Sequence, residues 1–223
     1  MPMITHVSCR RPFDRIVRDV FRDRSGLALI EFAYTFPLLL LLTLGGAELA
    51  NFITVKMRVS QIALHVADHG ARMGTGSVLA GKTVTESEIN DLFVGAGLQS
   101  GELGVLTNGR IILSSLEPMA NPNTADRYKI SWQRCKGGAS HASTYGLQGA
   151  QNLTGMGPAT RLAKAPDYGA TMFVELRYTY SPILQVIPMQ FGPFTEVAAM
   201  PVRDALQASM PTNADNVPIS TCA

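Results

Sequence analysis

Few residues in this chain have the side-chain types and the spacing that catalysis or metal binding requires. His65 and His69 are four residues apart on one predicted helix face, with Asp68 beside them, and metal sites use this spacing. No glutamate follows His65 and no third ligand is evident, so we expect a solvated helix face and no metal. His141 lies in an uncharged segment without an evident partner. Gly155-Met156-Gly157 is too sparse for a phosphate loop, and no nucleophile motif is present, so we expect no catalytic residues, no cofactor and no enzyme.

Glu31 is the residue whose position most needs a chemical explanation. Residues 32–47 carry no charge, and adding residues 27–30 gives 21 positions interrupted only by Glu31. A helix of that length covers roughly 30 Å, about one bilayer hydrocarbon core. A carboxylate at the headgroup level costs little, whereas one deeper in lipid is expensive and usually marks function. Both interpretations of Glu31 stay open on these grounds alone.

Composition narrows the class of protein. The chain has 223 residues, of which 46% are hydrophobic and 16% charged, and its formal net charge is +2. Disorder requires low hydrophobicity with high net charge, and nucleic-acid binding requires a clustered basic surface, so both classes are excluded. One segment alone is long and apolar enough to span a bilayer, which excludes a polytopic membrane protein.

The residues before the apolar run predict its orientation. Residues 1–26 contain six arginines and three aspartates, a balance of +3, which leaves −1 for residues 27–223. The positive-inside rule places such an N-terminus in the cytoplasm and the rest of the chain on the far side. Three interpretations remain: a signal peptide cut near Gly45-Gly46-Ala47, an uncleaved signal anchor, and a segment in which Glu31 has a function.

The sequence from Gly26 to Phe32 resembles the processing site of type IV prepilins and pseudopilins. A glycine, four apolar residues, a glutamate and an aromatic residue follow a basic leader and precede a leucine-rich run. In that family a prepilin peptidase cuts after the glycine, and the glutamate becomes the fifth residue of the mature chain. The resemblance implies cleavage between Gly26 and Leu27. It also implies that Glu31, with Phe32 beside it, serves assembly by pairing with the N-terminal amine of a neighbouring subunit.

The wider segment, about residues 22–75, resembles the TadE/TadG family of pseudopilin-like inner-membrane proteins in the tight-adherence pilus machinery. The resemblance rests on Ala28-Leu29-Ile30-Glu31-Phe32-Ala33, Phe36-Pro37 with five leucines, Gly45-Gly46-Ala47-Glu48-Leu49, and Val59 to Arg72. It implies a non-enzymatic, single-pass component of pilus assembly or secretion in a bacterial inner membrane, with a periplasmic C-terminal domain. The implied partners are the lipid bilayer, a prepilin peptidase if the chain is processed, and other pilus-machinery subunits or pilins. Nucleic acid and small-molecule substrates are not implied.

Two alternatives remain beside this hypothesis. The chain could be an uncleaved envelope scaffold protein with a single membrane span. It could also be an exported enzyme or binding protein whose signal peptide is removed.

One long helix is predicted to link membrane and domain. Apolar residues spaced 3, 4, 3 and 4 apart form a stripe that continues beyond Glu48; they are Phe52, Val55, Val59, Ile62 and Val66. The helix should end near Gly70, giving about 45 residues or roughly 65 Å. Pro37 removes one hydrogen bond, so we expect a kink there, which a membrane helix tolerates. Two helices broken at Gly45-Gly46 are the alternative.

The predicted fold is α+β and pilin-like, with an amphipathic helix packed on a small antiparallel sheet. Its parts are a cytoplasmic leader (1–26), a transmembrane helix (27–50), a membrane-exit helix (51–73) and a periplasmic α+β domain (74–223). A capping box from Thr85 to Glu88 predicts a short helix to about Gly95. Strands are predicted at 110–116, 128–132, 172–180 and, as an edge strand, 195–203. Alternation places Tyr128, Ile130 and Trp132 on one face.

Two further features concern the far-side domain. Residues 137–160 carry no charge, and a loop of this length is either a partner-contact surface or a mobile insertion. Cys9 falls in the leader, where thiols stay reduced, whereas Cys135 and Cys222 fall on the side that is oxidising in a Gram-negative envelope. We therefore expect one disulfide that tethers the C-terminal tail to a strand end, with two free thiols as the alternative.

Overall fold

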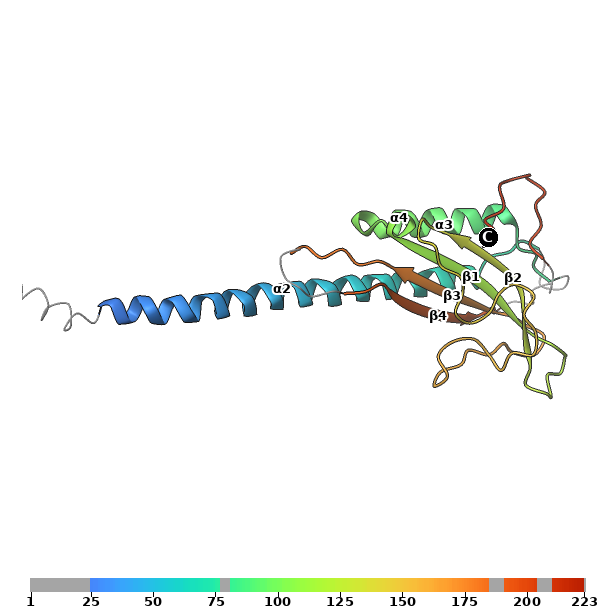
Figure 1. The fold of residues 1–223 in the computed structure, drawn as a ribbon. Coiled ribbons are helices and arrows are strands. Elements are labelled where there is room, and N and C mark those ends of the chain that lie inside the picture. Colours follow the sequence, from blue (N-terminus) through green and yellow to red (C-terminus); the bar gives the residue numbers. More distant parts are fainter. Residues whose placement is uncertain (1–24, 77–80, 185–190, 204–209, 223) are drawn as a thin grey trace, which may run out of the picture. The chain divides into compact units, whose positions relative to one another are not determined.

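The computed structural model describes residues 25–76, 81–184, 191–203 and 210–222, so Cys9 and the arginines of the leader lie outside it. The elements are, in chain order, α2 (Ser25–Gly70), α3 (Glu86–Ser100), η1 (Gly101–Leu103), α4 (Val105–Asn108), β1 (Gly109–Pro118), β2 (Tyr128–Lys136), β3 (Thr171–Tyr178) and β4 (Phe194–Pro201) (Figure 1). The fold is α+β, as predicted. The chain divides into two compact units, of which the first ends at Leu49 and the second begins at Ala50.

Helix α2 is continuous over 46 residues and includes Pro37 and the Gly45-Gly46 pair. The prediction of a single helix is therefore confirmed, and a break at the paired glycines is wrong. Within the second unit its apolar stripe faces inward: Val59, Ile62 and Val66 are at most 3% exposed. The spacing in the sequence thus fixes which face of the helix packs on the folded unit.

The sheet has the order β2-β1-β3-β4 and all of its pairs are antiparallel. The two central strands are buried on both faces, apart from the partly exposed Arg110 on β1 and Arg177 on β3. β4 is half-buried and lies at an edge of the sheet. Pro201 has no N–H to donate, and an edge strand tolerates this.

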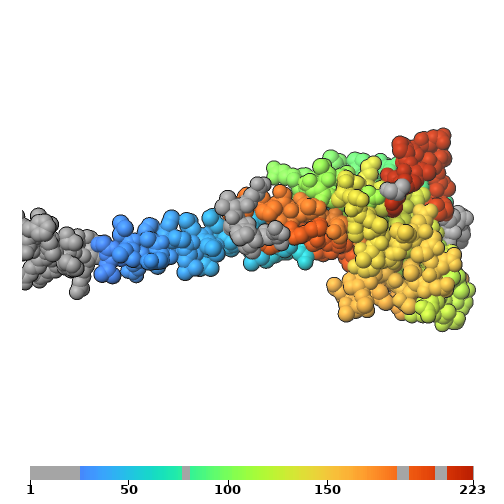
Figure 2. Space-filling model, in the orientation of Figure 1, coloured from blue at the N-terminus to red at the C-terminus, as the bar shows by residue number. Residues whose placement is uncertain are grey.

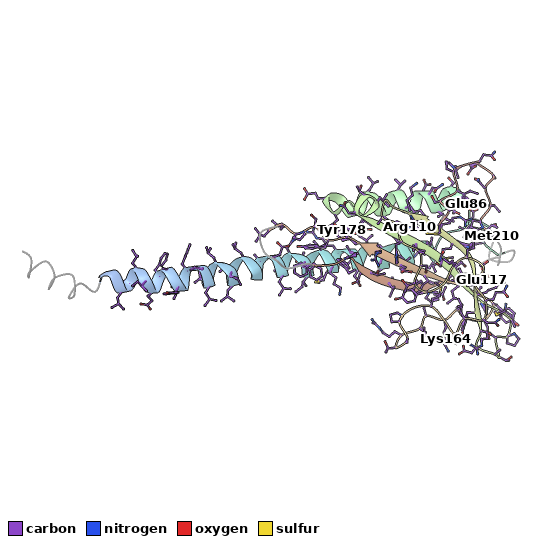
Figure 3. The ribbon with its side chains drawn as sticks, in the orientation of Figure 1. Glu86, Arg110, Glu117, Lys164, Tyr178 and Met210 are labelled. Atoms are coloured by element: carbon purple, nitrogen blue, oxygen red, sulfur yellow. A yellow bond between two sulfur atoms is a disulfide. The ribbon has the colours of Figure 1, made fainter. Side chains whose placement is uncertain are left out.

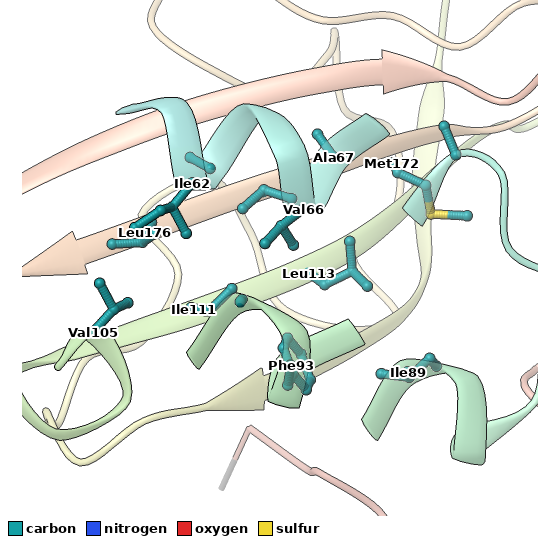
Figure 4. Close-up of a cluster of buried hydrophobic side chains, with 14 of the residues drawn as sticks. Ile62, Val66, Ala67, Ile89, Phe93, Val105, Ile111, Leu113, Met172 and Leu176 are labelled. Atoms are coloured by element: carbon teal, nitrogen blue, oxygen red, sulfur yellow. The ribbon is translucent and has the colours of Figure 1, made fainter. Parts of the chain in front are cut away.

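Two helices cover one face of the sheet and form the main core with it. α2 contributes Val59, Ile62 and Val66, while α3 contributes Ile89 and Phe93. Figure 4 shows Ile62, Val66 and Phe93 beside side chains of β1 and β3, which include Ile111, Leu113, Met172 and Leu176. Burying an aliphatic or aromatic side chain of this size stabilises a fold by about 1.5–3 kcal/mol, so this layer holds α2 in place.

The structure corrects the prediction that Tyr128, Ile130 and Trp132 share a face. Ser115 pairs with Trp132, whereas the next residue, Leu116, pairs with Ile130, so Ser131 is an extra residue on β2. A bulge of one residue reverses the facing of every later side chain. Trp132 therefore packs in the helix-covered core, and Tyr128 and Ile130 pack on the opposite face.

The uncharged segment covers that opposite face. Met156 is fully buried against Phe173 and Ile130 in a second apolar cluster. Main-chain bonds attach the segment to the edge of β2: Tyr128 N donates to Leu153 O and Ile130 N to Ala150 O, both at 2.9 Å. Figure 2 shows this segment, in yellow, as a continuous part of the visible surface. Residues 137–160 are thus a packed layer of the fold.

The predicted disulfide between Cys135 and Cys222 is present, with a Cα–Cα distance of 4.8 Å. Beside it, Cys135 N donates to Ser220 O at 2.8 Å, and Glu86 N donates to Thr212 O at 2.9 Å. The tail is therefore fixed to both β2 and the start of α3. In the chain-entropy model, closing a loop of this length stabilises a fold by roughly 4 kcal/mol.

Candidate functional site

The first half of α2 exposes its apolar side chains. Leu29 is 73% exposed, Tyr34 80% and Phe32 61%, although all three lie in a run without charge except for Glu31. Among the residues that the structure describes, one helix is long and apolar enough to cross a membrane, and its most apolar stretch has no buried residue. Leaving each of these large side chains in water costs about 1.5–3 kcal/mol relative to burial. This half of α2 therefore requires a bilayer or other helices around it.

Polar groups in this half are arranged for an apolar environment. Thr35 Oγ1 donates to Glu31 O and Thr43 Oγ1 donates to Leu39 O, both at 2.8 Å. Hydroxyls bonded in this way to the preceding turn have no need of water. The Glu31 carboxylate, by contrast, is exposed and is bonded to no side chain in the described part of the chain. Within residues 26–47 of the described chain, it is the one charged side chain.

The proposed cleavage point lies at the start of this helix. α2 begins at Ser25, so Gly26 and Leu27 are in its first turn, and Leu27 is 66% exposed. A Cβ built on Gly26 would meet no atom within 4 Å. No described part of the fold therefore obstructs the Gly26–Leu27 bond, although an enzyme that cuts it must first open one turn of helix. The candidate residues from Gly26 to Pro37 lie on one continuous element and are not brought together by folding.

Aromatic rings fasten the beginning of the second unit. The predicted stripe included Phe52, but the sequence alone did not indicate which rings it contacts. Phe52 on α2 stacks on Phe191 at 4.3 Å between ring centroids and meets Tyr180 edge-on at 5.2 Å. Asn51 Nδ2 donates to the Tyr180 hydroxyl at 2.6 Å. Burial raises the pKa of nearby Tyr178, which packs on Phe194. These contacts hold the first turns of this part of α2 beside the end of β3.

A buried ion pair joins α3 to β2. The Glu86 side chain is 1% exposed and that of Arg134 5%. Arg134 Nε donates to the two carboxylate oxygens at 3.0 and 2.9 Å, and Nη2 makes a further bond to Oε1. Figure 3 labels Glu86 near the beginning of α3. The pair links residues 48 apart in sequence, which no local pattern reveals.

A second buried carboxylate fastens the uncharged segment to β3. Glu175 is fully buried and accepts from Ser143 Oγ at 2.9 Å, Thr144 Oγ1 at 2.8 Å and Thr144 N at 3.1 Å. His141 Nε2 lies 2.8 Å from the same carboxylate, so the prediction that His141 lacks a partner is wrong. Burial and the nearby Glu175 charge raise the pKa of Tyr145. Three polar residues of this segment, His141, Ser143 and Thr144, therefore contact one buried charge.

The connection between β1 and β2 carries a smaller polar cluster. Lys164 and the Tyr128 hydroxyl both donate to the Asp126 carboxylate, and they lower its pKa. Burial, together with this bond to Asp126, raises the pKa of Tyr128 to about 12. The cluster ties the loop before β2 to Lys164, which lies four residues beyond the uncharged segment.

The histidine pair on α2 is exposed, as predicted. The rings of His65 and His69 are 6.5 Å apart, and His65 Nδ1 contacts Gln99 Nε2 on α3. No group of three or more histidine, cysteine, aspartate or glutamate side chains in the described ranges could hold a metal ion.

A long apolar helix that leads into a folded α+β unit is typical of single-pass, helix-anchored membrane proteins. Within that class, residues 26–72 match the family model described as TadE-like protein. The match confirms the resemblance over the segment that contains Gly26, Glu31 and the packed stripe. No curated protein and no solved structure matches the chain significantly.

Proposed function

We propose that the chain is a membrane-anchored, pseudopilin-like component of tight-adherence pilus assembly and acts by association rather than by catalysis. The observation that carries the proposal is the coincidence of the TadE-like match, residues 26–72, with a helix whose apolar side chains are exposed around one carboxylate. The bilayer covers the apolar side chains, and subunits of the pilus machinery supply the partner that Glu31 lacks within the described chain.

The proposed orientation places the N-terminus in the cytoplasm and the α+β unit in the periplasm. Six arginines precede Gly26, and arginines near a span stay on the cytoplasmic side. The disulfide between Cys135 and Cys222 supports this orientation, because disulfides persist in the oxidising periplasm and not in the cytoplasm. The membrane is then the inner membrane of a Gram-negative envelope.

The proposed processing step is cleavage by a prepilin peptidase between Gly26 and Leu27. Removal of the basic leader would create an amine at Leu27, one helical turn from Glu31 in the sequence of each subunit. In an apolar environment a carboxylate is stable only when paired, and the amine of a neighbouring subunit provides that charge. The pairing would fix the axial position of one helix against the next.

Two experiments test the proposal: a strain that lacks this chain, and topology reporters fused to it. We expect loss of surface pili without loss of growth, and recovery when the intact chain is supplied. Alkaline phosphatase fused after Cys222 should be active, whereas the same enzyme fused after Arg24, before the span, should be inactive. Normal piliation in the deletion strain, or the reverse reporter pattern, would contradict the proposal.

A further inference from the structure

A cavity of about 330 Å³ lies where β1 ends and where β2 and β3 begin. Two loops that form its walls are fastened to each other. Tyr168 N donates to Asn121 Oδ1 at 2.9 Å, and Asn123 N donates to Asp167 Oδ1 at 3.0 Å. The cavity is therefore preformed, and its volume is within the range of binding pockets for small groups.

Glu117 gives this cavity its chemistry. Its side chain is 3% exposed and lines the cavity, and Figure 3 labels it at the end of the sheet. Its contacts within the described residues are long: Lys129 Nζ lies 3.7 Å from Oε2, and Ser115 Oγ lies 3.5 Å from Oε1. Charge-assisted bonds to carboxylates are normally about 2.7–2.9 Å. Glu117 therefore retains unused capacity to accept hydrogen bonds.

Two other carboxylates are buried among the described residues of the second unit, and they differ from Glu117. Glu86 accepts three bonds from one guanidinium, and Glu175 accepts three short bonds from Ser143 and Thr144. A buried carboxylate with only long contacts destabilises the fold unless a ligand supplies the missing hydrogen bonds or charge. Glu117 differs from both because the space beside it is a cavity and not packed protein.

We propose that this cavity binds the guanidinium group of an arginine side chain presented by a protein partner. A guanidinium offers a planar pair of donors to a carboxylate and is more weakly hydrated than an ammonium group. The wall beside Glu117 is formed by the apolar atoms of Pro118, Met119, Ala120 and Ala170, which fit the methylene stem of such a side chain. Lys129, whose side chain is 40% exposed, can move its ammonium to solvent as the guanidinium enters.

Saturation-transfer NMR on the full chain in lipid nanodiscs tests the proposal. The probes are acetyl-arginine amide and its uncharged isostere acetyl-citrulline amide. We expect saturable binding of the arginine probe and binding at least about tenfold weaker for the citrulline probe, as loss of one charge-assisted bond implies. Glu117→Gln should weaken arginine binding by a similar factor, whereas Glu102→Gln, at an exposed carboxylate on η1, should leave it unchanged.

Lys129→Met provides a test of opposite sign. Removal of the competing ammonium should tighten binding of the arginine probe several-fold. Because Lys129→Met keeps Glu117, this test does not depend on the stability of Glu117→Gln. Equal binding of the arginine and citrulline probes, or weaker binding in Lys129→Met, would overturn the proposal. Guanidinium chloride that binds as tightly as acetyl-arginine amide would show that the stem contributes nothing, which would overturn the assignment to a side chain.

Discussion

Glu31→Ala should leave the protein in the membrane but stop its association with the pilus machinery. The substitution removes a charge from the apolar half of α2, which lowers the cost of insertion by about 2.5–3.5 kcal/mol if the residue lies deep in the bilayer. In the proposed assembly the same change leaves a neighbouring amine without its partner. Breaking one buried pair costs about 3–5 kcal/mol, so association should weaken by more than about a hundredfold.

Membrane fractionation and co-purification with the pilus machinery, together with counts of surface pili, measure this effect. Glu31→Gln is the matched control for shape, because it keeps the size of the side chain and removes only the charge; it should fail like alanine. Glu31→Asp keeps the charge and should retain part of the function. Wild-type piliation in both the alanine and the glutamine variants would remove the proposed role of Glu31.

Arg134→Met should destabilise the α+β unit more than any exposed substitution. It leaves Glu86, which is 1% exposed, as a buried carboxylate without its guanidinium. The expected loss of unfolding free energy is about 3–5 kcal/mol. For a folded unit of this size, that loss lowers the melting temperature by about 10 °C.

Thermal unfolding of the full chain in detergent, followed by circular dichroism, measures this change. Adding Glu86→Gln to Arg134→Met should recover most of the loss, because no uncompensated charge then remains. Lys164→Met is the matched control, since it breaks an ion pair that is about half exposed on both sides and should change stability little. If Arg134→Met melts like the Lys164 variant, the pair does not hold α3 to β2.

The spacing of apolar residues along the sequence predicted the helix and strand that depend on contacts of one segment's apolar face. The 3-and-4 spacing from Phe52 to Val66 predicted the packed face of α2, and alternation from Met172 to Tyr180 predicted β3, which ends at Tyr178. The capping box predicted where α3 begins, but not that it continues through Gly95 and Gly97 to Ser100. Glycine is a poor helix former, but α3 tolerates Gly97, where an added Cβ would lie 2.6 Å from Leu106 Cδ1 and would require that side chain to shift.

Long-range polar contacts could not be predicted in the same way. The bulge opposite Ser115 depends on how β1 and β2 pair, and it moves Trp132 to the other face without any change in the local pattern. The bonds of Glu175 to Ser143 and Thr144 join residues that are 31 and 32 apart. The disulfide could be predicted because the expected membrane topology, and not periodicity, separates Cys135 and Cys222 from Cys9.

The N-terminus of the protein purified from membranes tests the central proposal most directly, by intact mass and N-terminal peptide analysis. We predict a mature chain that begins at Leu27. Gly26→Ala is the matched control: the added Cβ meets no atom of the fold, so retention of the leader in this variant reports on the peptidase alone. A wild-type chain with the leader intact would contradict processing and favour the uncleaved scaffold. A chain that begins at Glu48 would contradict the anchor itself and favour an exported protein with a cleaved signal peptide.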